Sequence, residues 1–360
     1  MFSERTSVGL DVHARSVVAA AIDGVTGEVI RQKLVPAAEV VLDWVNTLPG
    51  PVAVTYEAGP TGFGLARAIT AAGLRCEVAA PSKLARAAGD RVKTDARDAM
   101  LLARLLRMDE IVSVRVPSIT QESARDLVRA REDARGDLLR TRHRVSKLLL
   151  RHGHVYYGGK AWTGKHEAWL RSIRFAEPGT QAAYEADLEA VELTMARRSR
   201  LDTSIAAMAA HSEFTAVTRK LCCLRGISTL SGFAMAVEIG DWDRFTGSSI
   251  GAYLGLVPSE HSSGESRRQG AITKAGNSHV RRLLVEAAWH HKPRYTVGAV
   301  MRARWEQAPA AARTRGHAGN QRLHHRWALY TAREKKPTVA NTAIARELAG
   351  WCWSLATMPD

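Results

Sequence analysis

Four acidic side chains in the first hundred residues have types and positions suited to metal-assisted chemistry on phosphodiesters. Asp11 lies inside an apolar run, where a carboxylate is costly unless it is paired or binds a cation. Glu57 ends a β-branched run, and Asp95 and Asp98 stand three apart at the start of an apolar helical segment, so they share a face. Two-metal catalysis requires several carboxylates that converge on one point. The four acids therefore predict a magnesium site, with manganese as an alternative ion.

Each acid taken singly also has a structural explanation. Asp95 could cap a helix, and Asp98 could be a favourable charge in its first turn. Glu57 could be a surface residue at the end of a strand. Taken together, clustered carboxylates without a cation repel one another, and this favours a metal site over four unrelated structural roles.

The elements that must position these acids alternate between strand and helix. We predict strands over residues 6–12, 17–22, 28–35, 52–56 and 76–79, and helices over residues 40–48, 61–72 and 94–107. Three strands, helix, strand, helix, strand, helix is the order of the α/β ribonuclease-H-like fold. In that topology the first and fourth strands are parallel neighbours, so Asp11 and Glu57 are expected side by side.

The chain beyond residue 116 reads as mainly helical. Long helices are predicted over residues 121–152 and 181–211, separated by an irregular insertion over residues 153–179 that is rich in glycine and aromatic residues. Two long antiparallel helices predict a coiled-coil arm, with an ordinary helical hairpin as the alternative. The predicted domains are residues 1–115 (α/β), 116–215 (arm), 216–300 (mainly α) and 301–360 (a basic tail that ends in a helix over residues 340–353).

The charge balance favours a polyanionic partner. Lys and Arg number 51 against 36 Asp and Glu, a formal net charge of +15, and such a field attracts nucleic acid. A protein that is merely basic is the alternative. The cationic side chains expected to bind nucleic acid are Arg125, Arg129, Arg135, Arg140, Arg142, Arg144, Lys147, Arg151, Arg267, Arg268 and Lys274.

Other classes of protein are not favoured. No apolar run approaches the roughly 18 residues of a spanning helix, and the first residues lack the order of a signal peptide, so no membrane association is expected. None of the four cysteines stands in a C-x-x-C pair, which gives no zinc-ribbon or thioredoxin motif. Reduced thiols and a cytoplasmic location are the simplest expectation.

Three motifs carry a family resemblance. The runs Gly9–His13, Tyr56–Gly59 and Lys93–Ala99 resemble the IS110 family of insertion-sequence transposases, relatives of the Piv and MooV invertases. The N-terminal domain of that family resembles the Holliday-junction resolvase RuvC and carries an Asp-Glu-Asp-Asp tetrad. The resemblance implies that the tetrad here consists of Asp11, Glu57, Asp95 and Asp98.

The resemblance continues into the predicted 216–300 domain. Residues 253–277 resemble the C-terminal transposase domain of the family, whose catalytic serine precedes a glycine, and this implies Ser263 as nucleophile with Ser262 as a close competitor. His261 could act as a base, although a loop histidine beside serine is more often incidental. Residues 224–227 resemble a helix-hairpin-helix element, but Ser228 stands where the family more often has glycine. A plain helical turn is the alternative.

The family further implies what the protein acts on. Its members join donor and target DNA under the direction of a structured guide RNA, called a bridge RNA, through a covalent phosphoserine and as a homodimer or homotetramer. Three rivals stay open. A RuvC-like structure-specific endonuclease would use water as nucleophile, an actin-like ATPase or sugar kinase would require Gly-rich loops that are not visible, and a non-catalytic nucleic-acid-binding protein would explain only the charge.

Overall fold

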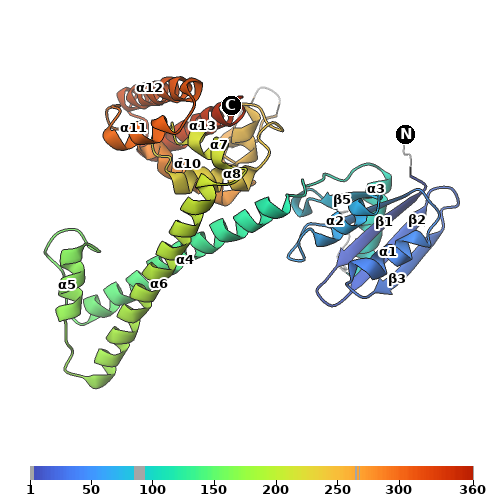
Figure 1. Cartoon of the computed structure of the whole chain (residues 1–360), viewed down its shortest axis with the longest axis horizontal. Helices are drawn as coiled ribbons and strands as arrows, with labels where there is room; N and C mark the ends of the chain where they lie inside the picture. Colours follow the sequence, from blue (N-terminus) through green and yellow to red (C-terminus); the bar gives the residue numbers. More distant parts are fainter. Residues whose placement is uncertain (1–3, 85–93, 264–265, 267, 360) are drawn as a thin grey trace. The chain divides into compact units, whose positions relative to one another are not determined.

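The computed structural model describes residues 4–84, 94–263, 266 and 268–359. The chain forms two compact units, Met1–Ser118 and Ile119–Asp360, which are described separately (Figure 1). Lys93 of the third family motif and Arg267 of the predicted basic set lie outside the described residues. No helix among the described residues is long and apolar enough to cross a membrane.

The first unit contains one mixed five-stranded sheet in the order β3-β2-β1-β4-β5. Strand β1 pairs antiparallel with β2 and parallel with β4, while β3 and β5 form the edges. The elements in chain order are β1 (Thr6–Val12), β2 (Val17–Asp23), β3 (Val29–Leu34), α1 (Ala38–Asn46), β4 (Val52–Glu57), α2 (Gly64–Ala71), β5 (Arg75–Ala79), the 3-10 turn η1 (Pro81–Lys83) and α3 (Asp95–Arg107). This α/β sheet is consistent with the predicted ribonuclease-H-like domain.

The two faces of this sheet bury alternate residues of the same strand. On β2, Val17, Ala19 and Ala21 pack in a core with residues of α1 and α2. Ala20 and Ile22 face the other way and pack against α3. Because successive side chains of a strand point to opposite faces, α1 and α2 cover one face of the sheet and α3 covers the other.

Helix α3 approaches β1 closely at Gly9. A Cβ at this position would overlap backbone atoms of Ala99 and Ala103 in α3, so only glycine allows the observed packing. Asp11 follows two residues later on the same face of β1 and is thereby directed toward the start of α3. The packing of helix on sheet thus sets the distance between the acids of the two elements.

The second unit begins with two long helices, α4 (Ile119–Arg151) and α6 (Pro178–Ala210), which lie side by side (Figure 1). They run antiparallel, since Val128 shares a core cluster with Ile205 near one end of the pair while Leu149 shares another with Tyr184 near the other end. The segment between them, predicted to be irregular, contains helix α5 (Gly164–Ser172). Leu170 of α5 is buried and its carbonyl accepts a hydrogen bond from the Tyr184 hydroxyl, which is a tertiary contact that local sequence does not indicate.

The rest of the second unit packs around one large apolar core. Residues from Leu221 to Leu355 contribute to it, including Leu284, Leu323 and Leu348. Residues 301–360, expected to be a basic tail, therefore form part of this core, because the apolar sides of their helices are buried while most of their arginines are exposed. The elements are α7 (Thr215–Leu221), α8 (Thr229–Ile239), α9 (Ser249–Tyr253), β6 (Pro258–Glu260), β7 (Gln269–Ile272), α10 (Ser278–Trp289), α11 (Ala299–Glu306), α12 (Ala310–Ala332) and α13 (Pro337–Ala356).

A buried carboxylate joins three helices of the second unit. Glu238 of α8 accepts two hydrogen bonds of 3.1 Å from Arg129 of α4 and one of 2.9 Å from the Asn277 side chain, which caps α10. Burial acts to raise the pKa of Glu238, but the neighbouring His279 ring and the Arg129 guanidinium stabilise its charged form and lower the pKa to about 2. Glu238 is therefore a charged contact between α4, α8 and α10.

Substitution of Gly9 by alanine is expected to destabilise the first unit. The added methyl group overlaps the α3 backbone, and such overpacking costs about 1–3 kcal/mol. Chemical denaturation measures the change in the free energy of unfolding. Gly64→Ala is the matched control, since a Cβ there meets no atom within 4 Å. Equal stabilities of the two variants would contradict the close approach of α3 to β1.

Substitution of Glu238 by glutamine is expected to reduce the acid sensitivity of the second unit. A carboxyl group whose folded pKa is below its unfolded pKa adds stability above the unfolded value, and this contribution is lost as the pH falls toward the folded pKa. Between pH 4.5 and the folded pKa of about 2, the wild type should lose about 1.4 kcal/mol per pH unit from this group, a loss that the variant lacks. Urea titrations at several pH values measure it. Glu189→Gln, at an exposed position of α6, should retain the wild-type acid sensitivity.

Candidate active site

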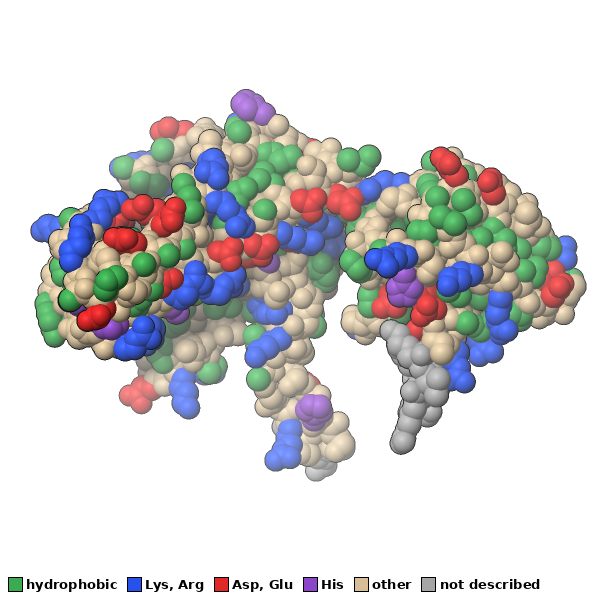
Figure 2. Space-filling model, turned by 90° about the horizontal axis from the view of Figure 1, so that it is seen from below, with side chains coloured by type: hydrophobic (Ala, Val, Ile, Leu, Met, Phe, Trp, Pro, Cys, Tyr) green, Lys and Arg blue, Asp and Glu red, His purple; other side chains and the backbone are tan. Residues whose placement is uncertain are grey.

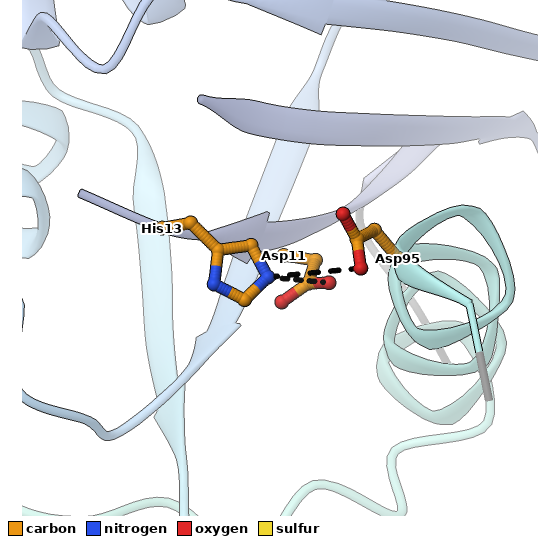
Figure 3. Close-up of side chains that lie close together, drawn as sticks. All are labelled: Asp11, His13 and Asp95. Carbon is orange, nitrogen blue, oxygen red and sulfur yellow. Dashed lines mark hydrogen bonds and ion pairs between the residues drawn. The ribbon is translucent and has the colours of Figure 1, made fainter. Parts of the chain in front are cut away.

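Asp11, His13 and Asp95 form a cluster at the carboxyl end of β1 (Figure 3). The His13 Nε2 atom lies 3.2 Å from Asp11 Oδ2 and 3.8 Å from Asp95 Oδ1. Asp95 is the first residue of α3, and the helix is capped by Thr94, whose hydroxyl accepts the backbone N–H of Arg97. One ligand atom from each of the three residues lies within 4.8 Å of the other two. The strand and the helix start therefore bring two predicted acids together.

The electrostatics of Asp11 favour a bound cation. Its side chain is 20% exposed, against 59% for Asp95. Burial raises the pKa of Asp11 above its ordinary value, the His13 ring opposes this, and the charges of Asp95 and Asp98 raise it further. Like charges at a half-buried carboxylate are relieved by a divalent cation, and carboxylate oxygens are ligands that magnesium and manganese accept. The residues present thus fit a divalent metal.

Asp98 and Glu57 stand next to this cluster rather than within it. Asp98 is half-buried one turn along α3, and its charge acts on Asp11. Glu57 ends β4, which pairs with β1 in parallel register, Leu10 opposite Tyr56. Asp11 and Glu57 also line the same cavity of about 960 Å³. In the described part of the chain, however, neither Glu57 nor Asp98 belongs to the group of ligand atoms within 4.8 Å of one another.

His13 is the member of the cluster that the sequence analysis did not assign. It stands two residues after Asp11, and the period of two along an extended chain directs both side chains to the same face. That spacing is the signal from which its position was predictable. The ring contacts Asp11 of β1 and Asp95 of α3. The contact with Asp95 depends on the packing of α3 on β1, so the sequence alone does not indicate it.

The serines stand on the β6–β7 hairpin of the second unit. The Ser262 hydroxyl donates a hydrogen bond of 2.9 Å to Glu260 Oε1. Ser263 exchanges two backbone hydrogen bonds of 3.1 Å with Ser266, which fixes its main chain, while Gly264 and Glu265 lie outside the described residues. The two serines are both exposed, and they differ in that Ser262 has a carboxylate partner.

Most of the arm arginines predicted to bind nucleic acid have partners within the protein. The guanidinium of Arg125 donates to the carbonyl oxygens of Val237 and Glu238, and that of Arg142 lies 4.6 Å from the ring centre of Trp162. Ion pairs join Arg129 to Glu238, Arg135 to Glu132, Arg140 to Asp137 and Arg144 to Asp187. Lys147, Arg151, Arg268 and Lys274 are exposed. Much of the arm's charge therefore also holds helices together.

The predicted helix-hairpin-helix element is a turn that leads into α8. Gly226 has a φ of +83° and lies against Ala287 of α10. Ser228, which replaces the family's more common glycine, is the N-cap of α8 and forms a capping box with Ser231. The Ser228 hydroxyl thus accepts the hydrogen bond of the Ser231 backbone N–H, which is therefore not free to bind a phosphate.

Comparison with known proteins identifies the family. A family model described as "Transposase", for DEDD transposases of IS110 type, matches residues 8–153, and one described as "Transposase IS116/IS110/IS902 family" matches residues 218–306. The chain is 39% identical to the putative transposase y4qE of Sinorhizobium fredii, over 97% of this chain and 88% of that protein. It is 27% identical to the transposase for insertion sequence element IS1533 of Leptospira borgpetersenii, over 91% and 97%. Two acids lie together at the carboxyl end of β1, and the matches extend along most of the chain. The chain belongs to the IS110 family of transposases, enzymes that cleave and rejoin DNA.

Proposed function

We propose that this transposase breaks and rejoins DNA strands with a divalent-metal centre held by Asp11, Glu57, Asp95 and Asp98 and with a serine as nucleophile. The observation that carries the proposal is the cluster of Asp11 and Asp95 around His13, with Asp98 one turn further along α3. Magnesium is the expected ion, and manganese fits the same ligands. Water as nucleophile, the endonuclease alternative, is an outcome of the tests below.

The acids have separate tasks in this proposal. Asp11 and Asp95 provide oxygen ligands from two elements. Glu57 and Asp98 complete the ligand set at the same end of the sheet, where β1 and β4 finish. His13 orients the Asp11 carboxylate through their 3.2 Å contact; which ring nitrogen carries the proton depends on the tautomer. When bound, the metal would neutralise charge on the phosphate and assist loss of the proton from the attacking hydroxyl.

The serine step exchanges one phosphate ester bond for another, so no external energy source is needed to rejoin the strands. The Ser263 Oγ loses its proton and attacks phosphorus, and the bond from phosphorus to the leaving strand oxygen breaks, so that a phosphoserine and a free strand hydroxyl result. A hydroxyl of the second strand then attacks the phosphoserine and releases the serine. Arg268, which is exposed in the same hairpin, stabilises the charge of the transition state.

Ser262 is the competing nucleophile in this proposal. Its hydroxyl has a carboxylate acceptor in Glu260 at 2.9 Å, and a carboxylate in that place can accept the proton as the oxygen attacks. Ser263 is favoured because it precedes Gly264, as the catalytic serine of the family does. Substitution of each serine by itself distinguishes the two candidates.

The proposed partners are donor DNA, target DNA and a structured guide RNA, bound by a homodimer or homotetramer. The exposed cations Lys147 and Arg151 of α4, and Arg268 and Lys274 of the hairpin region, are available for phosphate contacts. RNA that co-purifies with the protein, and whose digestion abolishes recombination, would support guidance. Recombination unaffected by RNA digestion would contradict it.

Magnesium or manganese is expected to raise the thermal unfolding temperature of the wild type. A ligand that binds only the folded state stabilises it in proportion to the logarithm of its concentration over its Kd. Asp11→Asn and Asp95→Asn should each remove most of this rise, because each loses a charged ligand. Asp43→Asn, on the exposed side of α1, is the control. A metal-induced rise of wild-type size in both active-site variants would refute the site.

Trapping of a covalent protein–DNA adduct is expected with the wild type and not with Ser263→Ala. Loss of the nucleophile should lower recombination by at least about 100-fold, while Ser262→Ala retains the adduct. Denaturing electrophoresis of labelled donor DNA measures both. An adduct that persists in Ser263→Ala and disappears in Ser262→Ala would reassign the nucleophile, and cleavage with no adduct in any variant would favour water.

A further inference from the structure

A basic groove in the second unit has no role in the function proposed so far. It has a volume of about 910 Å³ and is walled by α12, α13, the start of α9 and strand β7. Its charged and aromatic lining consists chiefly of Arg315, Arg322, Arg326, Arg346, Glu347 and Trp351. Four arginines face one glutamate, so the groove attracts anions.

The arginines of α12 form one row. Arg315, Arg322 and Arg326 are spaced by seven and four residues, which places them on one face of the helix. The row extends about 16 Å at 1.5 Å per residue. Because one strand of a duplex carries a phosphate per 3.4 Å of axis, such a row spans several phosphates rather than one small anion.

The three guanidinium groups of α12 have partners within the protein. Glu347 accepts from Arg322 at 2.7 Å and lies 3.3 Å from Arg326. Arg315 donates to the Ser354 hydroxyl at 2.7 Å and lies 4.6 Å from the ring centre of Trp351. A planar guanidinium fixed on one side presents its remaining N–H groups to a phosphate with little loss of side-chain entropy.

Arg346 of α13 lines the groove together with Gly251 of α9, where a Cβ would come within 3.1 Å of Arg346 Cγ. Arginines of both α12 and α13 therefore line the groove.

The groove adjoins the hairpin that carries the serines. Residues 270–272 of β7 form part of its wall, together with Pro258 of β6. Ser262 and Ser263 follow β6 in the same hairpin. A strand that lies along α12 and β7 would therefore pass close to the hairpin that carries these serines.

On the face seen in Figure 2, Asp and Glu side chains are interspersed with Lys and Arg side chains over the surface. The groove differs because its four arginines have one acid between them. Net charge alone would not select this site, but the row of fixed guanidiniums does.

We propose that the groove between α12, α13 and β7 binds the backbone of the DNA strand on which the enzyme acts. The inference rests on the proposed function for the identity of the strand, and on the groove itself for phosphate binding. The residues that bind are Arg315, Arg322, Arg326 and Arg346, and they act on affinity and position rather than on the chemical step. RNA as the occupant is the alternative outcome.

The test uses the full-length chain with Arg315→Gln, Arg346→Gln and the double variant. Binding of a labelled DNA duplex, a DNA single strand and an RNA single strand of the same sequence is measured over a range of salt. Each lost phosphate contact lowers the slope of log K against log salt by about 0.9 for duplex DNA and about 0.7 for a single strand, so the double variant should lose nearly two units of slope with the duplex. Arg315→Lys and Arg346→Lys keep the charge but not the planar donor, so they should retain the wild-type salt slope and recover part of the affinity.

Arg313→Gln is the matched control, since it removes the same charge from an exposed position of α12 that does not line the groove. An equal loss of DNA affinity in Arg313→Gln and in the groove variants would overturn the proposal, as would an unchanged salt slope in the double variant. A loss confined to RNA would replace DNA by RNA as the occupant. The thermal unfolding temperature of each variant is measured to exclude a loss of folding. Where a glutamine variant is less stable than the wild type, the DNA affinity of the corresponding lysine variant is used for the test instead.

A parallel measurement separates this proposal from the function on which it rests. Ser263→Ala leaves the groove intact and should bind DNA as the wild type does. Weakened DNA binding in the groove variants, combined with no covalent adduct in the wild type, would refute the serine mechanism and keep the groove. Wild-type affinity in the groove variants, combined with a normal adduct, would refute the groove and keep the serine mechanism.

Discussion

The geometry of the carboxylate cluster depends on one steric constraint, the close approach of α3 to β1 at Gly9. Any side chain there would overlap the backbone of α3, and the helix would have to move away from the sheet. Asp11 lies on the same face of β1 and Asp95 at the first position of the helix. A shift of α3 therefore changes the distance between the two carboxylates directly. A rigid strand and a capped helix start set that distance more accurately than loops would.

The same packing creates an electrostatic demand. Bringing α3 close places the charges of Asp95 and Asp98 near a half-buried Asp11, whose pKa is raised by its burial and by both neighbours. The His13 ring offsets this only in part. In the proposed site, a divalent cation would compensate all three charges at once. Its binding would then also stabilise the packing of α3 on β1.

The arginines of the second unit fall into two groups, those of α4 and those of α12 and α13. Arginines of α4 are used largely within the fold, as in the contact of Arg129 with the buried Glu238. Arginines of α12 and α13 line an open groove in which Glu347 orients two of them. Both groups look alike in the sequence, since each consists of arginines at helical spacing. The arginines of α12 and α13 differ from Arg129 in that they line an open groove, whereas the acid that Arg129 contacts is buried, with 2% of its side chain exposed.

Local pattern alone determined the strands and helices of the first unit, because a period of two or of 3.6 and the turn residues act over a few neighbours. The predicted parallel pairing of the first and fourth strands is observed, and Asp11 and Glu57 line one cavity, although Glu57 lies outside the cluster of ligand atoms around Asp11. Three features required the tertiary structure: the place of His13 between Asp11 and Asp95, the helix α5 within residues 153–179, and the burial of residues 301–360 in the C-terminal core. In each, the deciding contact joins residues far apart in the chain, such as Leu170 with Tyr184 or Leu323 with Leu348. A sequence pattern shows which residues are apolar or charged, whereas the residues that they contact depend on how the elements pack together.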